Sequence, residues 1–326
     1  MRKIAATYLF TPQAQLQKNT ILICENDGTV VDLVHKNEPL SEEAGLEFYS
    51  GILVPGFVNT FCRIAEQHDS NAMPTQASSA TSLAGGQQEK QKALIAADRK
   101  MWSSGIAAAA DISFSAQTTD RKQKSKIKYL MFVAVSGVAR SDADTAAEFV
   151  VGTGTQPNPP TQNTPVLQLP GSASQTALLT PVSHQTPLLL VLRDDFPEQE
   201  LARLLFRRSP ENTFFVVCTN AGLNSASNLL GTLRKHRFLF CFGTGISASS
   251  RPHSVLEEIK TMHRYFPEIQ LEDLLAAACI NGARALGIGH TFGSFETGKK
   301  PGVTLLSGLD LKQLKPGPQT RAKRLL

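Results

Sequence analysis

Residues 51–60 read GILVPGFVNT, and this passage separates two kinds of sequence pattern. Ile52–Val54 is a short apolar run, and the Pro55–Gly56 pair that follows it is a strong break in local structure. Before the break, the β-rich run Thr20–Cys24 and the run Thr29–Val34 are typical of strands joined by a turn. The chain up to this break is therefore predicted to form short strands.

After the break, segments with strand and helix patterns alternate. Helical spacing over Glu89–Ser103 is followed by a buried strand at Ile106–Ile112. A basic turn and a strand follow within Ser125–Val135. Further strands are predicted at Pro187–Leu192, Thr213–Cys218 and Phe238–Phe242, and further helices at Pro197–Arg207, Ala226–His236 and Ser254–Tyr265. This alternation predicts a parallel α/β fold, and the number of units favours a TIM (β/α)8 barrel over an open sheet.

Two stretches interrupt the alternation. Residues 69–88 are rich in Ser, Ala, Gln and Gly, and residues 140–183 are rich in Thr, Pro, Gln and Ser. Such compositions bury little apolar surface, so both stretches are predicted to be long loops or disordered segments.

Composition narrows the class of protein. The chain has 326 residues, 41% of them hydrophobic, which fits one large barrel domain or a barrel with a small appended domain. The five cysteines are scattered and form no CxxC pair, which favours reduced thiols in a cytoplasmic protein. No apolar run approaches ~18 residues, so no membrane span is expected.

The net charge of +5 comes partly from two basic runs, Arg121–Lys128 (RKQKSKIK) and Thr320–Leu326 (TRAKRLL). Charge runs usually lie on solvated faces, and no zinc-finger, RNP or helix-turn-helix pattern accompanies these two. We therefore expect solvated surface rather than a nucleic-acid site, and binding of nucleic acid or an acidic partner is kept as an alternative function.

Several segments resemble the amidohydrolase superfamily, in its cytosine-deaminase and chlorohydrolase-like branch and a bacterial subgroup of it. Residues 51–60 resemble the passage from that family's small β-sandwich into its first barrel strand. The other resembling segments are Gly105–Ser113, Cys218–Leu223, Phe242–Ser249, Leu271–Leu286 and Phe292–Pro301. The resemblance covers roughly residues 1–60, 89–138 and 188–306.

The resemblance implies a domain organisation. Residues 55–291 would form the TIM barrel, which could be a degenerate one. Within it, residues 69–88 and 140–183 would be long loops or disordered segments. Residues 1–54 and 292–326 would together form a composite β-sandwich domain.

The resemblance also implies a chemistry, the metal-dependent hydrolysis or deamination of carbon–nitrogen bonds other than peptide bonds. A zinc or iron ion would lower the pKa of a bound water. The family's ligands come from an NTHxH phrase, a histidine ending strand six and the aspartate of a GTD phrase. Here those positions hold Phe61 and Arg63, then Leu192, then Gly245, and the strand-five histidine has no equivalent.

None of these replacements can bind a divalent cation, so we predict no catalytic residue, no metal ligand and no cofactor. Structural or surface roles are favoured for the other polar candidates, which are Cys62, His68, Asp69, Asp111, His184, Asp194, Asp195 and a pairing of Cys218 with His184 or His236. The sequence therefore predicts a catalytically inactive pseudoenzyme of the amidohydrolase family.

Two other functions are kept as alternatives: an active hydrolase with a rebuilt site, and a protein that binds through its basic surface. A small molecule and a second copy of the chain remain candidate partners. The ancestral substrate is not readable, because the segments that would contact it fail to match the family.

Overall fold

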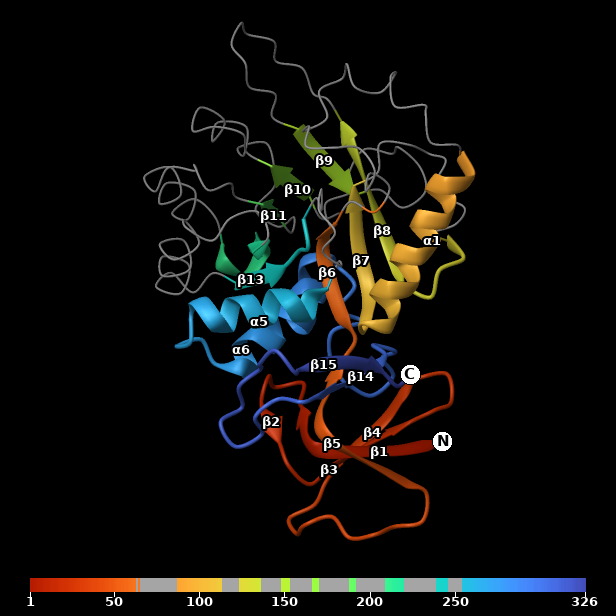
Figure 1. Cartoon of the computed structure of the whole chain (residues 1–326), viewed down its shortest axis with the longest axis vertical. Helices are drawn as coiled ribbons and strands as arrows, with labels where there is room; N and C mark the ends of the chain where they lie inside the picture. The colour runs from red at the N-terminus through yellow and green to blue at the C-terminus, as the bar shows by residue number, and fades with distance from the viewer. Residues whose placement is uncertain are drawn as a thin grey trace, which may run out of the picture.

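The computed structural model describes residues 1–62, 64, 87–112, 123–135, 148–152, 166–169, 188–191, 209–219, 239–245 and 254–326. The strands of these residues form two sheets, one of seven strands and one of eight. Figure 1 shows the smaller sheet at one end of the molecule, with both ends of the chain beside it, and the larger sheet above it. No helix among the described residues is long and apolar enough to cross a membrane.

The seven-stranded sheet combines the two ends of the chain. Its strands are β1 (Arg2–Phe10), β2 (Leu16–Gln17), β3 (Thr20–Cys24), β4 (Val30–His35), β5 (Leu46–Pro55), β14 (Val303–Ser307) and β15 (Arg321–Arg324). The order is β15-β14-β5-β1-β3-β4, with β2 paired to β1. Strand β5 runs parallel to β1 and antiparallel to β14, so the last strands complete a sheet that the first ones begin. The division into domains and the sandwich form stay predictions.

Strand β5 leads directly into the larger sheet. Only Gly56 separates it from β6 (Phe57–Cys62). A Cβ at Gly56 would lie 2.4 Å from the Cβ of Ala107 and 2.6 Å from the carbonyl oxygen of Pro301. Glycine is thus required where the chain passes between the two sheets.

Gly51 marks a second close approach within β5. Its φ of +147° is a backbone conformation that residues with side chains rarely adopt. A Cβ there would lie 2.1 Å from the carbonyl oxygen of Leu306 in β14. The Gly51 amide donates to the hydroxyl of Thr7 at 3.3 Å, beside a register shift between β1 and β5. The pairing of β5 with β14 therefore requires glycine at position 51.

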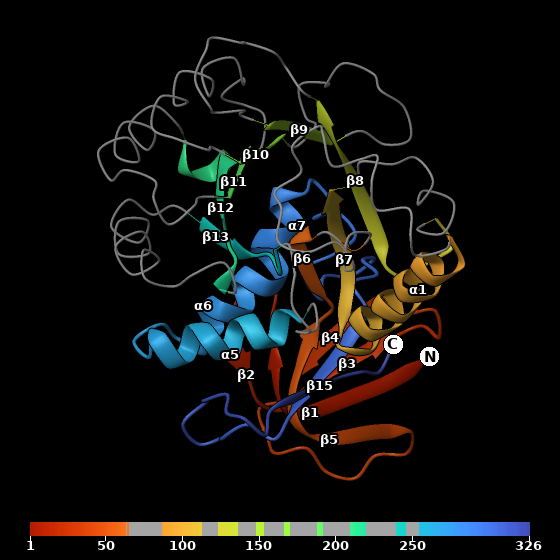
Figure 2. The ribbon, with the colours of Figure 1, turned by 45° about the horizontal axis from the view of Figure 1, so that its top comes forward.

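The eight-stranded sheet runs in chain order and closes on itself. After β6 come β7 (Ile106–Ile112), β8 (Lys128–Val135), β9 (Glu148–Gly152), β10 (Val166–Leu169), β11 (Leu188–Val191), β12 (Thr213–Val217) and β13 (Leu239–Phe242). A parallel bridge between Cys62 and Gly245 joins the last strand region to the first. Figure 2 shows the strands following one another around a curve. This is a TIM-barrel-type fold, as the sequence predicts.

The barrel departs from the regular pattern at β9, which pairs antiparallel with both β8 and β10. The stretch 140–183 was expected to be a loop, and this expectation is wrong at β9 and β10. Their short apolar runs, EFVVG and VLQL, suffice to pair with neighbouring strands although the surrounding composition is polar. Residues 69–86 lie outside the described residues.

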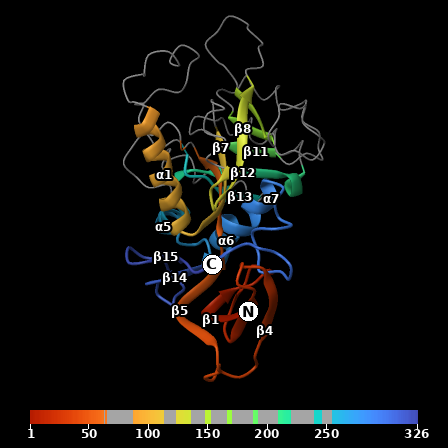
Figure 3. The same cartoon turned by 90° about the vertical axis from the view of Figure 1, so that its right-hand side faces the viewer.

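The described helices cover the larger sheet. They are α1 (Gln87–Ser103), α5 (Val255–Tyr265) and α6 (Leu271–Ala276), which continues through the π-helical turn η5 (Ala277–Asn281) into α7 (Gly282–Ala285); η3 (Pro210–Asn212) is a short 3-10 turn. Figure 3 shows α1 along one side of β7 and β8. The helices predicted at 197–207 and 226–236 fall outside the described residues.

Alternation along the barrel strands separates two buried clusters. Phe215 and Val217 of β12 pack with residues of α1 and α5, and we call this group the outer cluster. Phe214 and Val216, which alternate with them, belong to a group that we call the inner cluster. The inner cluster also contains Phe61, Ala108, Ala110, Leu189, Cys241, Ala283 and Leu286.

Candidate functional site

The closing seam of the barrel holds two of the positions at which the resemblance places metal ligands. The carbonyl oxygen of Phe61 accepts hydrogen bonds from the amides of Thr244 at 2.9 Å and Gly245 at 3.0 Å. The amide group of Asn59 donates to the hydroxyl of Thr244 at 2.8 Å, and the Asn59 Oδ1 accepts from the Thr244 amide at 3.1 Å. The ends of β6 and β13 are thus joined where a metal would bind in the family.

Phe61 occupies the first histidine position with an apolar side chain. It is buried, with 4% of its surface exposed, and it packs within the inner cluster. A Cβ at Gly243 would lie 2.7 Å from the Cβ of Phe61 and 2.8 Å from a methyl group of Val216. The Phe61 side chain therefore lies among apolar side chains, beside Gly243, where any larger residue would clash.

Gly245 occupies the aspartate position without a side chain. Its φ is +68°, in the left-handed region that favours glycine. A Cβ there would have room, because the nearest atoms are the Cβ and Sγ of Cys218 at 3.7 and 3.8 Å. A side chain at this position is thus disfavoured by the positive φ of the backbone and not by steric crowding.

The remaining two ligand positions, Arg63 and Leu192, lie outside the described residues. The same is true of His68, Asp69, His184, Asp194, Asp195 and His236. Nothing in the structure tests a role for these residues.

Cys218 follows β12 directly and faces the Gly245 position. Burial, the nearby carboxylate of Glu258 and the thiol of Cys241 raise the pKa of Cys218 well above its ordinary value, against a smaller opposing effect of the Gly245 and Gly243 amides. A thiol is nucleophilic and binds metal as the thiolate. At neutral pH Cys218 is therefore a protonated and weakly reactive thiol.

Glu258 is a buried carboxylate that the sequence reasoning did not single out. Only 1% of its surface is exposed, and its Oε2 accepts from the amide of Thr219 at 2.6 Å and from the hydroxyl at 2.5 Å. Its spacing in α5 gave a signal, because residues three before and four after it, Val255 and Met262, are buried. Glu258 fixes the backbone just past β12, which makes it a positioning residue.

Asp111 and Cys62 have structural contacts, in agreement with the roles favoured from the sequence. The buried Asp111 carboxylate accepts from the amide of Ile64 at 3.1 Å. The Cys62 thiol donates to the carbonyl oxygen of Ala110 at 3.4 Å and packs in the outer cluster. Asp111 therefore supports the chain as it leaves β6.

The described residues of the seam do not fit a divalent ion. Phe61 and Gly245 carry no donor atom in their side chains, and zinc or iron needs imidazole, thiolate or carboxylate ligands. In the described part of the chain, no group of three or more His, Cys, Asp or Glu side chains is placed to hold a metal ion.

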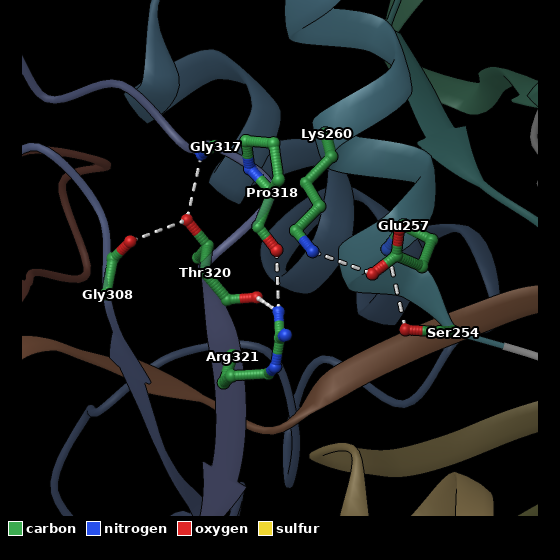
Figure 4. A network of polar contacts seen from close by, with 8 residues as sticks. All are labelled: Ser254, Glu257, Lys260, Gly308, Gly317, Pro318, Thr320 and Arg321. Carbon is green, nitrogen blue, oxygen red and sulfur yellow. Dashed lines mark hydrogen bonds and ion pairs between the residues drawn. The ribbon is translucent and has the colours of Figure 1, made fainter.

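Replacing Glu258 by alanine is expected to lower the free energy of unfolding by about 3 kcal/mol, because the Thr219 amide and hydroxyl lose a buried acceptor. Glu257 is the matched control, since its side chain is 53% exposed and pairs with Lys260 (Figure 4). Glu257→Ala should cost less than about 1 kcal/mol, as exposed ion pairs do. Urea denaturation measures both changes, and equal losses would contradict the role given to Glu258.

Comparison with known proteins supports one superfamily. The model of the amidohydrolase family matches residues 200–322, which include Gly245 and the helices α5 to α7. A search of curated proteins finds no match.

Solved structures of similar fold include two deaminases and a dipeptidase. An adenosine deaminase from Xanthomonas campestris with bound zinc is 14% identical, with a TM-score of 0.60 over 96% of this chain and 86% of the other. A Helicobacter pylori aminofutalosine deaminase is 13% identical, with a TM-score of 0.58 over all of both chains. A Xaa-Pro dipeptidase is 11% identical, with a TM-score of 0.61 over 96% of each chain. These likenesses show the TIM-barrel-type fold. Support for the amidohydrolase superfamily comes from the family match over residues 200–322.

Proposed function

We propose that this chain is a catalytically inactive member of the amidohydrolase superfamily, descended from a metal-dependent hydrolase of carbon–nitrogen bonds. We place its ancestry in the cytosine-deaminase and chlorohydrolase-like branch. The observation that carries the proposal is the side chain of Phe61, which is buried in the inner cluster at the first histidine position. A fold alone does not confer a reaction, which depends on the groups in the site.

The chemistry of the ligand positions supports the proposal. When bound, a divalent metal in this family activates a water molecule and so supplies the attacking hydroxide. Phe61 and Gly245 offer no ligand for such an ion, and the sequence places Arg63 and Leu192 at two further ligand positions. The fixed positive charge of an arginine would in addition repel a cation.

An active hydrolase with a rebuilt site is the alternative. Its described candidates are Cys218, which follows β12, and Glu258 of α5, whose carboxylate is near the Cys218 thiol. The raised pKa of Cys218 favours an unreactive thiol, and the Glu258 carboxylate is engaged by Thr219. Both observations favour a structural use of these groups over a catalytic one.

Metal content and turnover of the purified protein test the proposal. After incubation with zinc or iron(II) and dialysis, we expect far less than one ion per chain by inductively coupled plasma mass spectrometry. We expect no ammonia release from nucleosides or nucleobases and no cleavage of Xaa-Pro dipeptides above the blank. The zinc-binding Xanthomonas deaminase, treated identically, is the positive control. Stoichiometric metal together with chelator-sensitive hydrolysis would support the rebuilt site instead.

The thiols also bear on where the protein works. All five cysteines are free, and four of them are buried. Free thiols persist in reducing compartments, so we propose a cytoplasmic location.

A further inference from the structure

The segment between β14 and β15, residues 308–320, is closed on itself, and we call it the β14–β15 loop. The amide of Asp310 donates to the carbonyl oxygen of Lys315 at 3.0 Å, and the amide of Lys315 donates back at 3.1 Å. The Asp310 carboxylate accepts from the amides of Lys312 at 2.8 Å and Gln313 at 3.0 Å. The middle of the loop is therefore a compact turn with its own hydrogen bonds.

Apolar side chains hold this loop against the outer cluster. Leu309, Leu311 and Leu314 are half-buried and pack against that cluster, to which α5 contributes Ile259 and Met262. A short paired turn is marginally stable in water by itself. The internal hydrogen bonds of the β14–β15 loop are therefore expected to last only while the loop is docked.

His263 lies in the last turn of α5, next to Met262 of the outer cluster. Its Nδ1 is buried and has no hydrogen-bond partner among the residues that the structure describes. In a neutral imidazole one ring nitrogen carries no proton, so Nδ1 can lie there without being an unpaired donor. Protonation would add an N–H that neither water nor an acceptor reaches, and an unpaired buried donor is costly.

The charges around His263 also disfavour its protonation. The charged residues of α5 and of the β14–β15 loop are Glu257, Glu258, Lys260, Arg264, Asp310, Lys312 and Lys315. The three carboxylates have other partners, which are a lysine, Thr219 and the amides of the loop itself. In the described part of the chain, Lys315 is the charged group that shifts the pKa of His263, and it acts in the same direction as burial. A protonated His263 would thus be near a lysine without a compensating carboxylate.

We propose that His263 is a pH-sensitive switch, whose protonation releases the β14–β15 loop from α5. The buried Nδ1 without an acceptor and the nearby Lys315 both act against a charged imidazole in the docked state. Strand β15 follows the loop directly, so release would also loosen the strand that brings the Arg324 guanidinium to the carbonyl oxygen of Gly105. The proposal is independent of the barrel seam and stands whether or not the chain hydrolyses a substrate.

The direction of the pH effect follows from the two states of the loop. In the docked state burial, and then the Lys315 ammonium, hold the pKa of His263 below its ordinary value of 6.5. Once the loop has left α5, the imidazole meets water and its pKa returns towards about 6.5. The released form therefore binds a proton more readily than the docked form. Docking is thus strongest above about pH 6.5 and weakens as the pH falls below that value.

Hydrogen–deuterium exchange of the full chain, measured by mass spectrometry on peptides from residues 308–320, tests the proposal. Each exchange rate is divided by the intrinsic rate at the same pH, so that only the opening equilibrium of the loop remains. In the wild type this corrected rate is expected to rise at least about threefold between about pH 7.5 and about pH 5.5. His263→Gln, which cannot be charged, should show no such rise.

His290→Gln is the matched control, because His290 is exposed and lies outside α5 and the β14–β15 loop. It should keep the full rise of the wild type. Lys315→Gln changes an exposed residue and so provides a second variant that is expected to fold. It removes the neighbouring positive charge and should therefore reduce the rise. Circular dichroism at about pH 7.5 verifies that each variant folds.

Three results would overturn the proposal. The first is a corrected exchange rate in the wild type that does not change with pH. The second is an equal rise in His263→Gln, because another group would then control the loop. The third is an NMR titration of the His263 ring that gives a pKa at or above about 6.5, because protonation would then not oppose docking.

Discussion

Replacing Gly51 by alanine is expected to lower the free energy of unfolding by about 4 kcal/mol, the sum of backbone strain and overpacking. The strain arises because φ at this residue is +147°. The overpacking arises because a Cβ would lie 2.1 Å from the Leu306 carbonyl oxygen, a backbone atom held in β14. Relief would require β5 and β14 to separate, which would break the join between the two ends of the chain.

Gly298 provides the control for this prediction. It also has a positive φ, +85°, but no atom lies within 4 Å of an added Cβ. Gly298→Ala should therefore cost only the conformational strain, about 1 kcal/mol. Urea denaturation followed by circular dichroism measures both variants. Equal decreases in the free energy of unfolding for the two variants would show that the close approach of Leu306 does not contribute to the cost at Gly51.

Restoring the four family ligands, with Phe61→His, Arg63→His, Leu192→His and Gly245→Asp, is expected to destabilise the fold without creating a zinc enzyme. The imidazole would replace a buried ring in the inner cluster, and the aspartate would have to adopt a φ of +68°. Together these two changes should cost about 4 kcal/mol. The strand-five ligand and the groups that orient the ligands are also missing, so affinity for zinc should stay low.

Zinc content, chelator-sensitive ammonia release and urea denaturation measure the outcome. The single variants Phe61→His and Gly245→Asp separate the two sources of instability. Phe61→Leu, which keeps an apolar side chain, should cost less than about 1.5 kcal/mol. Stoichiometric zinc with measurable turnover in the fourfold variant would contradict our account of the site, because recovery would then need only the four ligand side chains.

The sequence predicted those elements whose local pattern agrees with their final environment. The helix α1 and the strands β3, β7 and β12 lie within about two residues of their predicted bounds. Strands β9 and β10 were missed because each is a short apolar run within a polar stretch. Their pairing depends on neighbours distant in sequence, which local patterns do not encode.

The candidate site shows the same division between local and distant information. Motif order placed Phe61 and Gly245 on neighbouring strands, and the structure joins them by a hydrogen bond at 3.0 Å. Glu258 was missed although its position on the apolar face of α5 was visible in the sequence. The hydrogen bond that Glu258 accepts from the Thr219 amide joins two segments distant in sequence, so it becomes visible only in the folded structure.

The sharing of one sheet between both ends of the chain has a consequence for biosynthesis. While the ribosome still holds residues 303–324, β5 has no partner on the side where β14 will pair, and the apolar residues Ile52 and Leu53 lack part of their cover. Such an edge is a site for aggregation, and it stays exposed until residues 303–307 have left the ribosome and can pair with β5. The nascent chain therefore has a period in which chaperones would be expected to engage it, and the pairing of β14 with β5 ends that period.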